Sequence, residues 1–271
     1  MAHFSRIGLS LLAACTIAAI SAGIASALPE VGRCVSQPGT GRYRDAGCIE
    51  KAGSPVEQKK FEWSKGAGGG SKAFAVAGGE AGLETERGTK LVCKTVSGTG
   101  EYHEVNGVIN SVTKEVLAFR GCMYPIVDVG CNSQGGVEGE LVTNPLKGKL
   151  AYISGKGTKT PVVGQELTPM IKGGKVATCK VLGNNGAIGE GAGKGGNRII
   201  STVSGLDVMS MTSGEAFAAS ASGVQSPQSF EGLFKIANLE WRLNEEPWER
   251  MSWSLEATTS NEQPLEIKAI P

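Results

Sequence analysis

The chain has 271 residues, including 40 glycines and 11 prolines, and its 27 Lys and Arg residues nearly balance its 26 Asp and Glu residues. A formal net charge of +1 disfavours nucleic acid and other polyanions as partners, because these need a strongly basic surface. The length suffices for one large all-β domain or two small ones.

The first 27 residues have the pattern of a cleaved signal peptide. Arg6 precedes the apolar run Ile7–Ile24, and Ala25–Ala27 supplies the small residues of a cleavage site, so the mature chain is expected to begin at Leu28. No later segment approaches the roughly 20 apolar residues of a bilayer span, and we predict a secreted protein with no permanent membrane span.

Lipidation is an alternative route to the same compartment. Leu12–Cys15 has the shape of a bacterial lipoprotein box in which Cys15 would carry the lipid. The apolar run continues past Cys15, whereas a polar tether normally follows an acylated cysteine, and this argues for the secreted form.

Three regions follow the signal peptide. Residues 28–64 are predicted to be a disulfide-stapled N-terminal arm, too small for its own core. Residues 65–72 are a glycine-rich linker or loop, and residues 73–271 form the main β domain.

An even number of cysteines in an exported chain indicates disulfides, here three. Proximity in sequence favours Cys34 with Cys48 and Cys122 with Cys131, which leaves Cys93 for Cys179. A zinc site fits poorly, because the sequence has no Cys-x-x-Cys and the mature chain has one histidine. We predict no metal and no cofactor.

Alternating patterns predict many short strands. The clearest is Arg250–Ala257, in which every second residue is apolar, and Leu265–Ala269 alternates in the same way. Thr143–Lys147 reads as a hairpin connection. Further strands are expected at residues 90–97, 108–120, 136–143, 147–154, 175–182, 198–203 and 230–243. With no helix of crossover length between them, they favour an antiparallel sandwich or barrel.

Five parts of the sequence carry a family resemblance: Cys34–Cys48, Phe61–Trp63, Gly139–Leu150, Val163–Pro169, and Asn261–Glu262 with Leu265–Ile267. They resemble a multi-copy family of uncharacterised exported proteins of soil actinobacteria. The resemblance implies an exported β-rich protein and transfers no catalytic residue.

Two sequence patterns match functional motifs in residue type but lack the surrounding features that those motifs require. Gly191–Gly196 matches Gly-x-Gly-x-x-Gly but lacks the flanking strand and helix of a phosphate cradle. A Ser-His-Asp triad would have to use His103 with Asp45, Asp128 or Asp207, and no Gly-x-Ser-x-Gly elbow is present. A surface or structural role for His103 is favoured.

A hydrolase is one of the alternatives, because glycoside hydrolases use two Asp or Glu residues that need not be close in sequence. Glu138 and Glu140 would share one strand face, as would Glu84 and Glu86, although alternating acidic residues are typical of the solvated side of a sheet. We therefore predict no catalytic residues.

Tryptophans near the C-terminus suggest a ligand contact. Trp253 lies on the apolar face of its strand and is expected in the core, whereas Trp248 follows Glu246 and Pro247 and is the candidate for exposure. The sequence favours a non-catalytic structural or binding component outside the cell, whose partner is an unidentified polymer or protein. A carbohydrate-binding module is the principal alternative, and a secreted carboxylate-dependent hydrolase comes third.

Overall fold

The computed structural model describes residues 29–70, 72–133, 135–190, 196–219, 222–232 and 237–269. The predicted cleavage site at Ala27 and Leu28, the alternative lipid site at Cys15 and residues 191–195 of the glycine run lie outside them. Within these ranges the structure contains no long apolar helix of the kind that spans a bilayer.

The described residues form eighteen strands, joined in one mainly antiparallel network, and one short 3₁₀ helix, Val56–Gln58. The first nine are β1 (Glu30–Ser36), β2 (Phe61–Lys65), β3 (Ala73–Thr85), β4 (Lys90–Cys93), β5 (Thr95–Val105), β6 (Val108–Arg120), β7 (Met123–Tyr124), β8 (Val129–Gly130) and β9 (Glu140–Val142). The others are β10 (Leu146–Ser154), β11 (Val162–Pro169), β12 (Lys175–Val181), β13 (Asn184–Glu190), β14 (Ile199–Ser204), β15 (Ser210–Ala219), β16 (Gln225–Ser226), β17 (Leu239–Leu243) and β18 (Glu249–Lys268). The predicted all-β, antiparallel fold class is confirmed.

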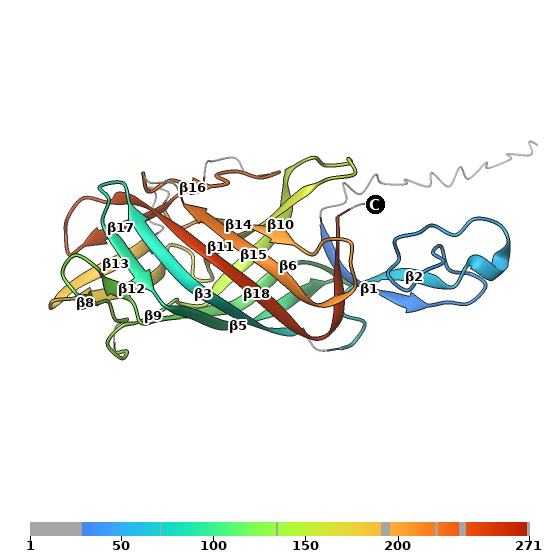
Figure 1. The fold of residues 1–271 in the computed structure, drawn as a ribbon, viewed down its shortest axis with the longest axis horizontal. Helices are drawn as coiled ribbons and strands as arrows, with labels where there is room; N and C mark the ends of the chain where they lie inside the picture. The colour runs from blue at the N-terminus through green and yellow to red at the C-terminus, as the bar shows by residue number, and fades with distance from the viewer. Residues whose placement is uncertain are drawn as a thin grey trace, which may run out of the picture.

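Eight of these strands close a barrel (Figure 1). In order around the wall they are β3, β18, β15, β14, β11, β10, β6 and β5, and β5 pairs again with β3. Closure leaves no free edge along this ring, which is how all-β proteins avoid edge-to-edge aggregation. Of the two predicted architectures, sandwich or barrel, the structure has the barrel.

Strand β18 runs along the length of the barrel and connects its two ends (Figure 1). The segments Arg250–Ala257 and Leu265–Ala269, predicted as separate strands, belong to this one strand and the residue after it. Its first residues pair with β17, its middle with β15 and its last residues with β1. Strand β17 pairs with β13, and β13 pairs with β12. These three strands extend the wall beyond the ends of β14 and β15.

The end of the barrel beside β17 has an aromatic interior. Trp253 on β18 is 1% exposed, and its ring lies edge-on to that of Phe119 at 5.1 Å and to that of Phe217 at 6.3 Å. Side chains that alternate along one strand face pack together inside the barrel, so the predicted core position of Trp253 is confirmed.

Glycines on the inner face make room for large neighbours. At Gly100 of β5 an added Cβ would lie 2.3 Å from the ring of Phe74, which is paired with it on β3. A residue with a side chain cannot occupy this position while Phe74 fills the interior.

The disulfides require a correction. The structure joins Cys93 to Cys122 and Cys131 to Cys179, whereas sequence proximity favoured Cys122 with Cys131 and Cys93 with Cys179. All four cysteines lie in the main core cluster.

Strand pairing explains the corrected connectivity. The backbone N–H of Lys94 donates to the carbonyl oxygen of Arg120 at 2.8 Å, which brings the cysteine before Lys94 beside the start of β7. Asn132 and Lys180 exchange two backbone hydrogen bonds, of 3.2 and 2.6 Å, and each is adjacent to a cysteine. Contacts between distant strands therefore decide the pairing, and proximity in sequence does not.

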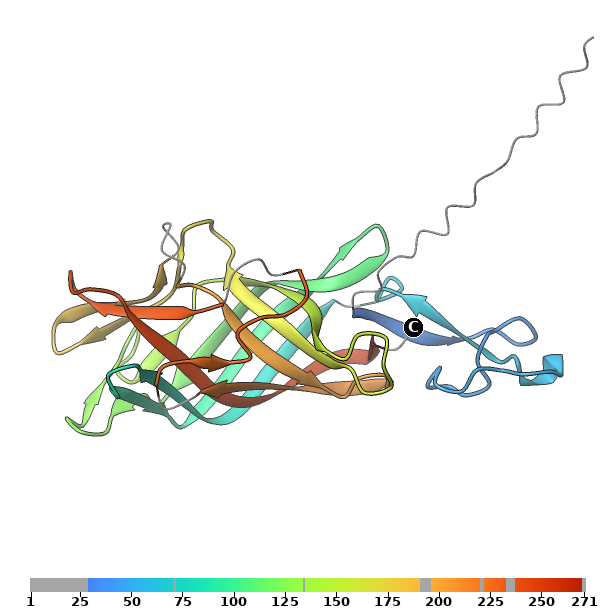
Figure 2. The ribbon, with the colours of Figure 1, turned by 90° about the horizontal axis from the view of Figure 1, so that it is seen from above.

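The N-terminal arm leaves the barrel as a β1–β2 hairpin (Figure 2). The predicted Cys34–Cys48 disulfide closes it. Its base is part of the barrel, because β1 pairs with both β18 and β6, and Val31 is fully buried in the core. Residues 28–64 thus include one segment that packs into the main β domain.

Within the glycine-rich segment, Lys65 ends strand β2 and residues 66–70 form a loop packed against the barrel. Ala67 is fully buried, and its carbonyl oxygen accepts a hydrogen bond of 3.2 Å from the Gln263 side chain. Gly66 donates its N–H to the carbonyl oxygen of Val31 at 3.0 Å.

The predicted hairpin at Thr143–Lys147 is wrong. Strands β9 and β10, on either side of it, both pair with β6 and not with each other. Among the described residues, only 140–142 of the predicted strand 136–143 and 239–243 of the predicted strand 230–243 are in strands, namely β9 and β17. The predicted strand 90–97 is divided between β4 and β5. Strands β1, β2, β3, β7, β8, β11, β13, β15 and β16 were not predicted.

Candidate functional site

A hollow of about 490 Å³ lies on the outer face of β12, β13 and β17, and we call it the basic hollow. It is lined chiefly by polar and basic side chains, namely Lys175, Thr178, Lys180, Asn185, Arg242 and Asn244. One acidic residue, the exposed Glu245, also lines it and lies 3.8 Å from the Arg242 guanidinium group. The strand register explains why these side chains lie together. Lys180 on β12 is opposite Asn185 on β13, and Ala187 on β13 is opposite Thr178 on one side and Arg242 on the other. Residues opposite each other in neighbouring strands point to the same side of a sheet.

Arg242 is the most constrained residue of the basic hollow. Its guanidinium group lies 4.7 Å from the centre of the Trp248 ring, and it forms an ion pair of 3.2 Å with Glu190. Lys175 and Lys180 form no ion pair within the described residues. The hollow therefore combines a fixed cation with two ammonium groups that are free to meet a ligand.

Trp248, the residue predicted to contact a ligand, is half-buried beside this hollow. One face of its ring is covered by the Arg242 guanidinium, so this face is not open for stacking against a sugar. The structure places Trp248 as a support for Arg242.

The side chains of Asn185 and Asn244 complete the polar lining. Asn244 accepts a hydrogen bond of 3.0 Å at its side-chain oxygen from the Asn185 N–H, and its amide group donates to Asn184 at 2.9 Å. These contacts hold the β12–β13 turn against the segment that follows β17. Amides and ammonium groups in such an arrangement can bind hydroxyl groups and single negative charges.

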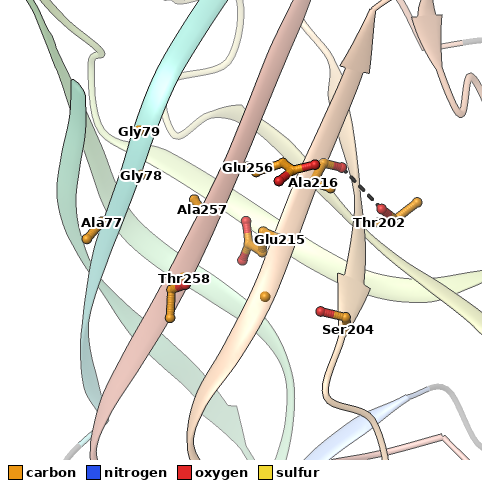
Figure 3. A pocket seen from close by; sticks show the side chains of 11 residues that line it. Ala77, Gly78, Gly79, Thr202, Ser204, Glu215, Ala216, Glu256, Ala257 and Thr258 are labelled. Atoms are coloured by element: carbon orange, nitrogen blue, oxygen red, sulfur yellow. Dashed lines mark hydrogen bonds between the residues drawn. The ribbon is translucent and has the colours of Figure 1, made fainter. Parts of the chain in front are cut away.

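A second, shallower hollow lies on the wall formed by β3, β18, β15 and β14 (Figure 3). Small residues leave it open, among them Gly78, Gly214 and Ala216, and its polar groups include Thr202 and Glu256. The Thr202 hydroxyl donates to the carbonyl oxygen of Ala216 at 3.2 Å. With no aromatic or basic side chain in its lining, this hollow has fewer groups that could hold a ligand.

Behind this wall, the barrel interior contains two buried glutamates that the sequence analysis did not single out. Glu115 on β6 is 1% exposed and Glu215 on β15 is 8% exposed. The Gln165 side-chain amide donates to a carboxylate oxygen of Glu115 at 3.2 Å, and the Tyr102 hydroxyl donates to Asn261 at 3.0 Å nearby. We call these five residues the interior polar cluster.

Burial changes the acidity of this cluster. It raises the pKa of Glu115 well above the usual range, the charge of Glu215 raises it further, and the Gln165 hydrogen bond opposes this. Burial also raises the pKa of Glu215 to about 7, against a smaller opposite effect of the Thr259 hydroxyl. The pKa of Tyr102 is raised by burial and then by the two glutamate charges. No Lys, Arg or His among the described residues is buried beside them.

His103 lies exposed on the outer face of β5. The aspartates named with it serve other purposes: Asp45 accepts the backbone N–H groups of Gly47, Ile49 and Glu50 inside the arm, at 2.6–3.2 Å. Asp207 accepts the backbone N–H of Ala269 at 3.0 Å. Both hydrogen-bonding roles described for these aspartates are to backbone N–H groups and do not involve His103.

The two carboxylate pairs weighed from sequence lie on the outside of the wall. Glu140 forms an ion pair with Arg120 at 3.2 Å, and Glu84 with Lys90 at 3.2 Å. Each is a cross-strand partner of its cation. Opposite charges facing each other across strands are a common way to stabilise a solvated sheet face.

No cluster of three or more His, Cys, Asp or Glu side chains arranged to hold a metal ion occurs in the described ranges. The sequence matches no protein-family profile, no curated protein and no solved structure.

Proposed function

We propose that this chain is a non-catalytic binding component that works outside the cell and holds an extracellular polymer in the basic hollow. Export is supported by the signal-peptide pattern of residues 1–27 and by the resemblance to exported actinobacterial proteins. Three disulfides also fit an oxidising compartment.

One observation supports the proposal: in the part of the chain that the structure describes, Lys180 and Lys175 have no ion-pair partner, and they line the hollow in which Arg242 is held by Trp248. Unneutralised ammonium groups suit a ligand with negative charge. The nearby amides of Asn185 and Asn244 suit hydroxyl groups. The ligand class that matches both is a glycan with isolated acidic groups, consistent with the low net charge, which disfavours a dense polyanion.

A non-catalytic role is supported by how the carboxyl groups are used. A glycoside hydrolase needs two carboxyl groups about 5–10 Å apart that both reach the substrate. Glu140 and Glu84 are neutralised by cations on the outer wall, and Glu115 and Glu215 are enclosed inside the barrel.

The test is binding of the oxidised mature protein to matched neutral and acidic glycans at low and high salt. We expect the acidic glycans to bind preferentially and binding to weaken as salt rises, since exposed charges are screened. Lys180→Gln should weaken binding about tenfold, which corresponds to about 1.4 kcal/mol.

Lys147→Gln is the matched control, because Lys147 is exposed on β10, outside the basic hollow. It should leave affinity unchanged. Equal losses for Lys180→Gln and Lys147→Gln would mean that general charge attracts the glycan, and no binding to any glycan would favour a structural or protein-binding role.

A further inference from the structure

The interior polar cluster is enclosed by strands from every side of the barrel. Tyr102 is on β5, Glu115 on β6, Gln165 on β11 and Glu215 on β15, with Asn261 on β18. Apart from the two glutamates and the tyrosine, the groups that face the pair are neutral: the amides of Gln165 and Asn261 and the hydroxyl of Thr259 on β18. Two carboxylates in such a place repel each other and lack a compensating cation.

A distorted backbone directs Glu115 inward. Lys114 has φ of +53°, a left-handed conformation that is rare for a residue with a long side chain. The β6–β10 register shifts here, between the pairs Leu146–Glu115 and Gly148–Val112. As a result both Val112 and Glu115 are buried although they are three residues apart, where a regular strand would turn one of them outward.

The β6–β10 seam is also a weak part of the wall. It has three paired positions, as does the β14–β15 seam that includes Glu215, whereas the β5–β6 seam on the other side of the same strand has ten. A change in charge at Glu115 therefore acts where few backbone hydrogen bonds oppose separation.

We propose that Glu115 and Glu215 form a proton-dependent lock: the barrel is closed firmly while the pair is protonated, and the β6–β10 seam loosens when both carboxyl groups lose their protons. The raised pKa values of the two groups support this. A carboxyl group whose pKa is higher in the folded state holds its proton more tightly there, so its contribution to stability is complete below about pH 4.5 and is lost as the pH rises through about 7.

The first experiment follows equilibrium unfolding of the oxidised full protein between pH 5 and pH 8. From the change at Glu215 alone, the unfolding constant should rise by about 10- to 100-fold over this interval. Glu215→Gln keeps the shape of the protonated side chain without its charge, and Glu115→Gln does the same on the other strand. Each single variant should remove only its own share of the rise, because burial keeps the pKa of the other carboxyl group raised, and the double variant Glu115→Gln/Glu215→Gln should reduce the rise to a few-fold or less.

Glu256→Gln is the matched control, since Glu256 is exposed on β18 next to the strand that carries Glu215. It should retain the full pH dependence. Glu266, another buried carboxyl group, is paired with Lys268 at 3.0 Å and is unchanged in all these variants, so its contribution cancels in the comparison.

Hydrogen exchange at pH 8 locates the opening. Peptides that cover residues 112–118 and 146–150 should exchange faster in the unmodified protein than in Glu215→Gln, whereas those covering β3 should not differ. Comparison at one pH removes the intrinsic pH dependence of exchange.

Three results would overturn the lock. The first is an unfolding constant that does not change between pH 5 and pH 8, and the second is the same rise in Glu215→Gln and in the unmodified protein. The third is stabilisation at pH 8 by millimolar calcium that is reversed by a chelator and absent in Glu215→Gln, because the pair would then be a cation site.

Discussion

The barrel interior is filled in two different ways along its length. Beside β17, the apolar half consists of large rings and aliphatic side chains around Trp253. Beyond Glu215, the polar half contains the interior polar cluster. The two halves share strands, since Glu215 and Phe217 are two residues apart on the inner face of β15.

The comparison shows that one closed wall can enclose interiors of different physical character. Burial of aromatic and aliphatic surface stabilises the apolar half at any pH. The polar half contributes fully only while its carboxyl groups are protonated. The two disulfides within the barrel belong to the apolar half, because Cys93 is on β4, which pairs with β3 beside Leu83, and Cys179 is on β12, which is joined to β17 through β13.

The largest effect is expected from Trp253→Ala in the apolar half. Removing this fully enclosed ring leaves a cavity beside Phe119 and Phe217 and should lower the free energy of unfolding by about 3–5 kcal/mol. Denaturant unfolding at pH 5 and pH 8 should give the same loss, because no titrating group is removed.

Trp248→Ala is the control for loss of a tryptophan. Its ring is half-buried and contacts Arg242, so the loss should stay near 1 kcal/mol. A loss for Trp253→Ala as small as this would contradict the assignment of the aromatic cluster as the main stabilising element.

The second effect is loss of the Cys131–Cys179 disulfide, by replacing both cysteines with alanine. The bond closes a loop with a sequence separation of 48, and its removal should lower stability by about 2–5 kcal/mol. Denaturant unfolding under non-reducing conditions measures this loss.

Tryptic mapping checks the connectivity independently. Cys122 and Cys131 lie on one tryptic peptide, residues 121–147, because no Lys or Arg occurs between them. The structure therefore predicts one species of three linked peptides, joined to those with Cys93 and Cys179. A peptide 121–147 with an internal disulfide would instead support the pairing expected from sequence.

The fold could be predicted from sequence wherever one strand face is apolar. Strand β6 has the predicted bounds, Val108–Arg120, and alternation in Arg250–Ala257 located the first half of β18. Strands β13 and β15 could not be predicted in this way, because their glycine, serine and alanine residues do not alternate with large apolar residues. Pairing between distant strands, on which two disulfides depend, has no local signal at all.

The functional sites were harder to predict for related reasons. The basic hollow is assembled from three strands, so no motif marks it. The interior glutamates did leave a trace: Glu115, Leu117 and Phe119 are alternate residues, which places a carboxyl group on the apolar face of the strand. A charged residue at a core position of an alternating pattern is the signal that could have identified the interior polar cluster.

A smaller effect is expected from Gly100→Ala at the edge of the polar half. The new methyl group would overlap the Phe74 ring, which packs at 5.0 Å from the ring of Tyr102. Overpacking should lower stability by about 1–3 kcal/mol, as thermal unfolding would show. Gly79→Ala on β3 is the control, because an added Cβ there meets nothing within 4 Å. Equal, negligible effects would mean that the two rings are not tightly packed.

The smallest effect is expected from Tyr102→Phe, which removes one buried hydroxyl group from the polar half. The substitution breaks the hydrogen bond to Asn261, and the free energy of unfolding should fall by about 1 kcal/mol. Tyr152→Phe is a matched comparison, since the Tyr152 hydroxyl donates to the carbonyl oxygen of Ala269 at 2.6 Å and is also buried. Similar losses at pH 5 mean that each hydroxyl group contributes one ordinary hydrogen bond. A loss above about 3 kcal/mol for Tyr102→Phe alone would mean that its hydroxyl group also stabilises the glutamate pair, and the polar half would then be a single hydrogen-bonded network instead of two adjacent contacts.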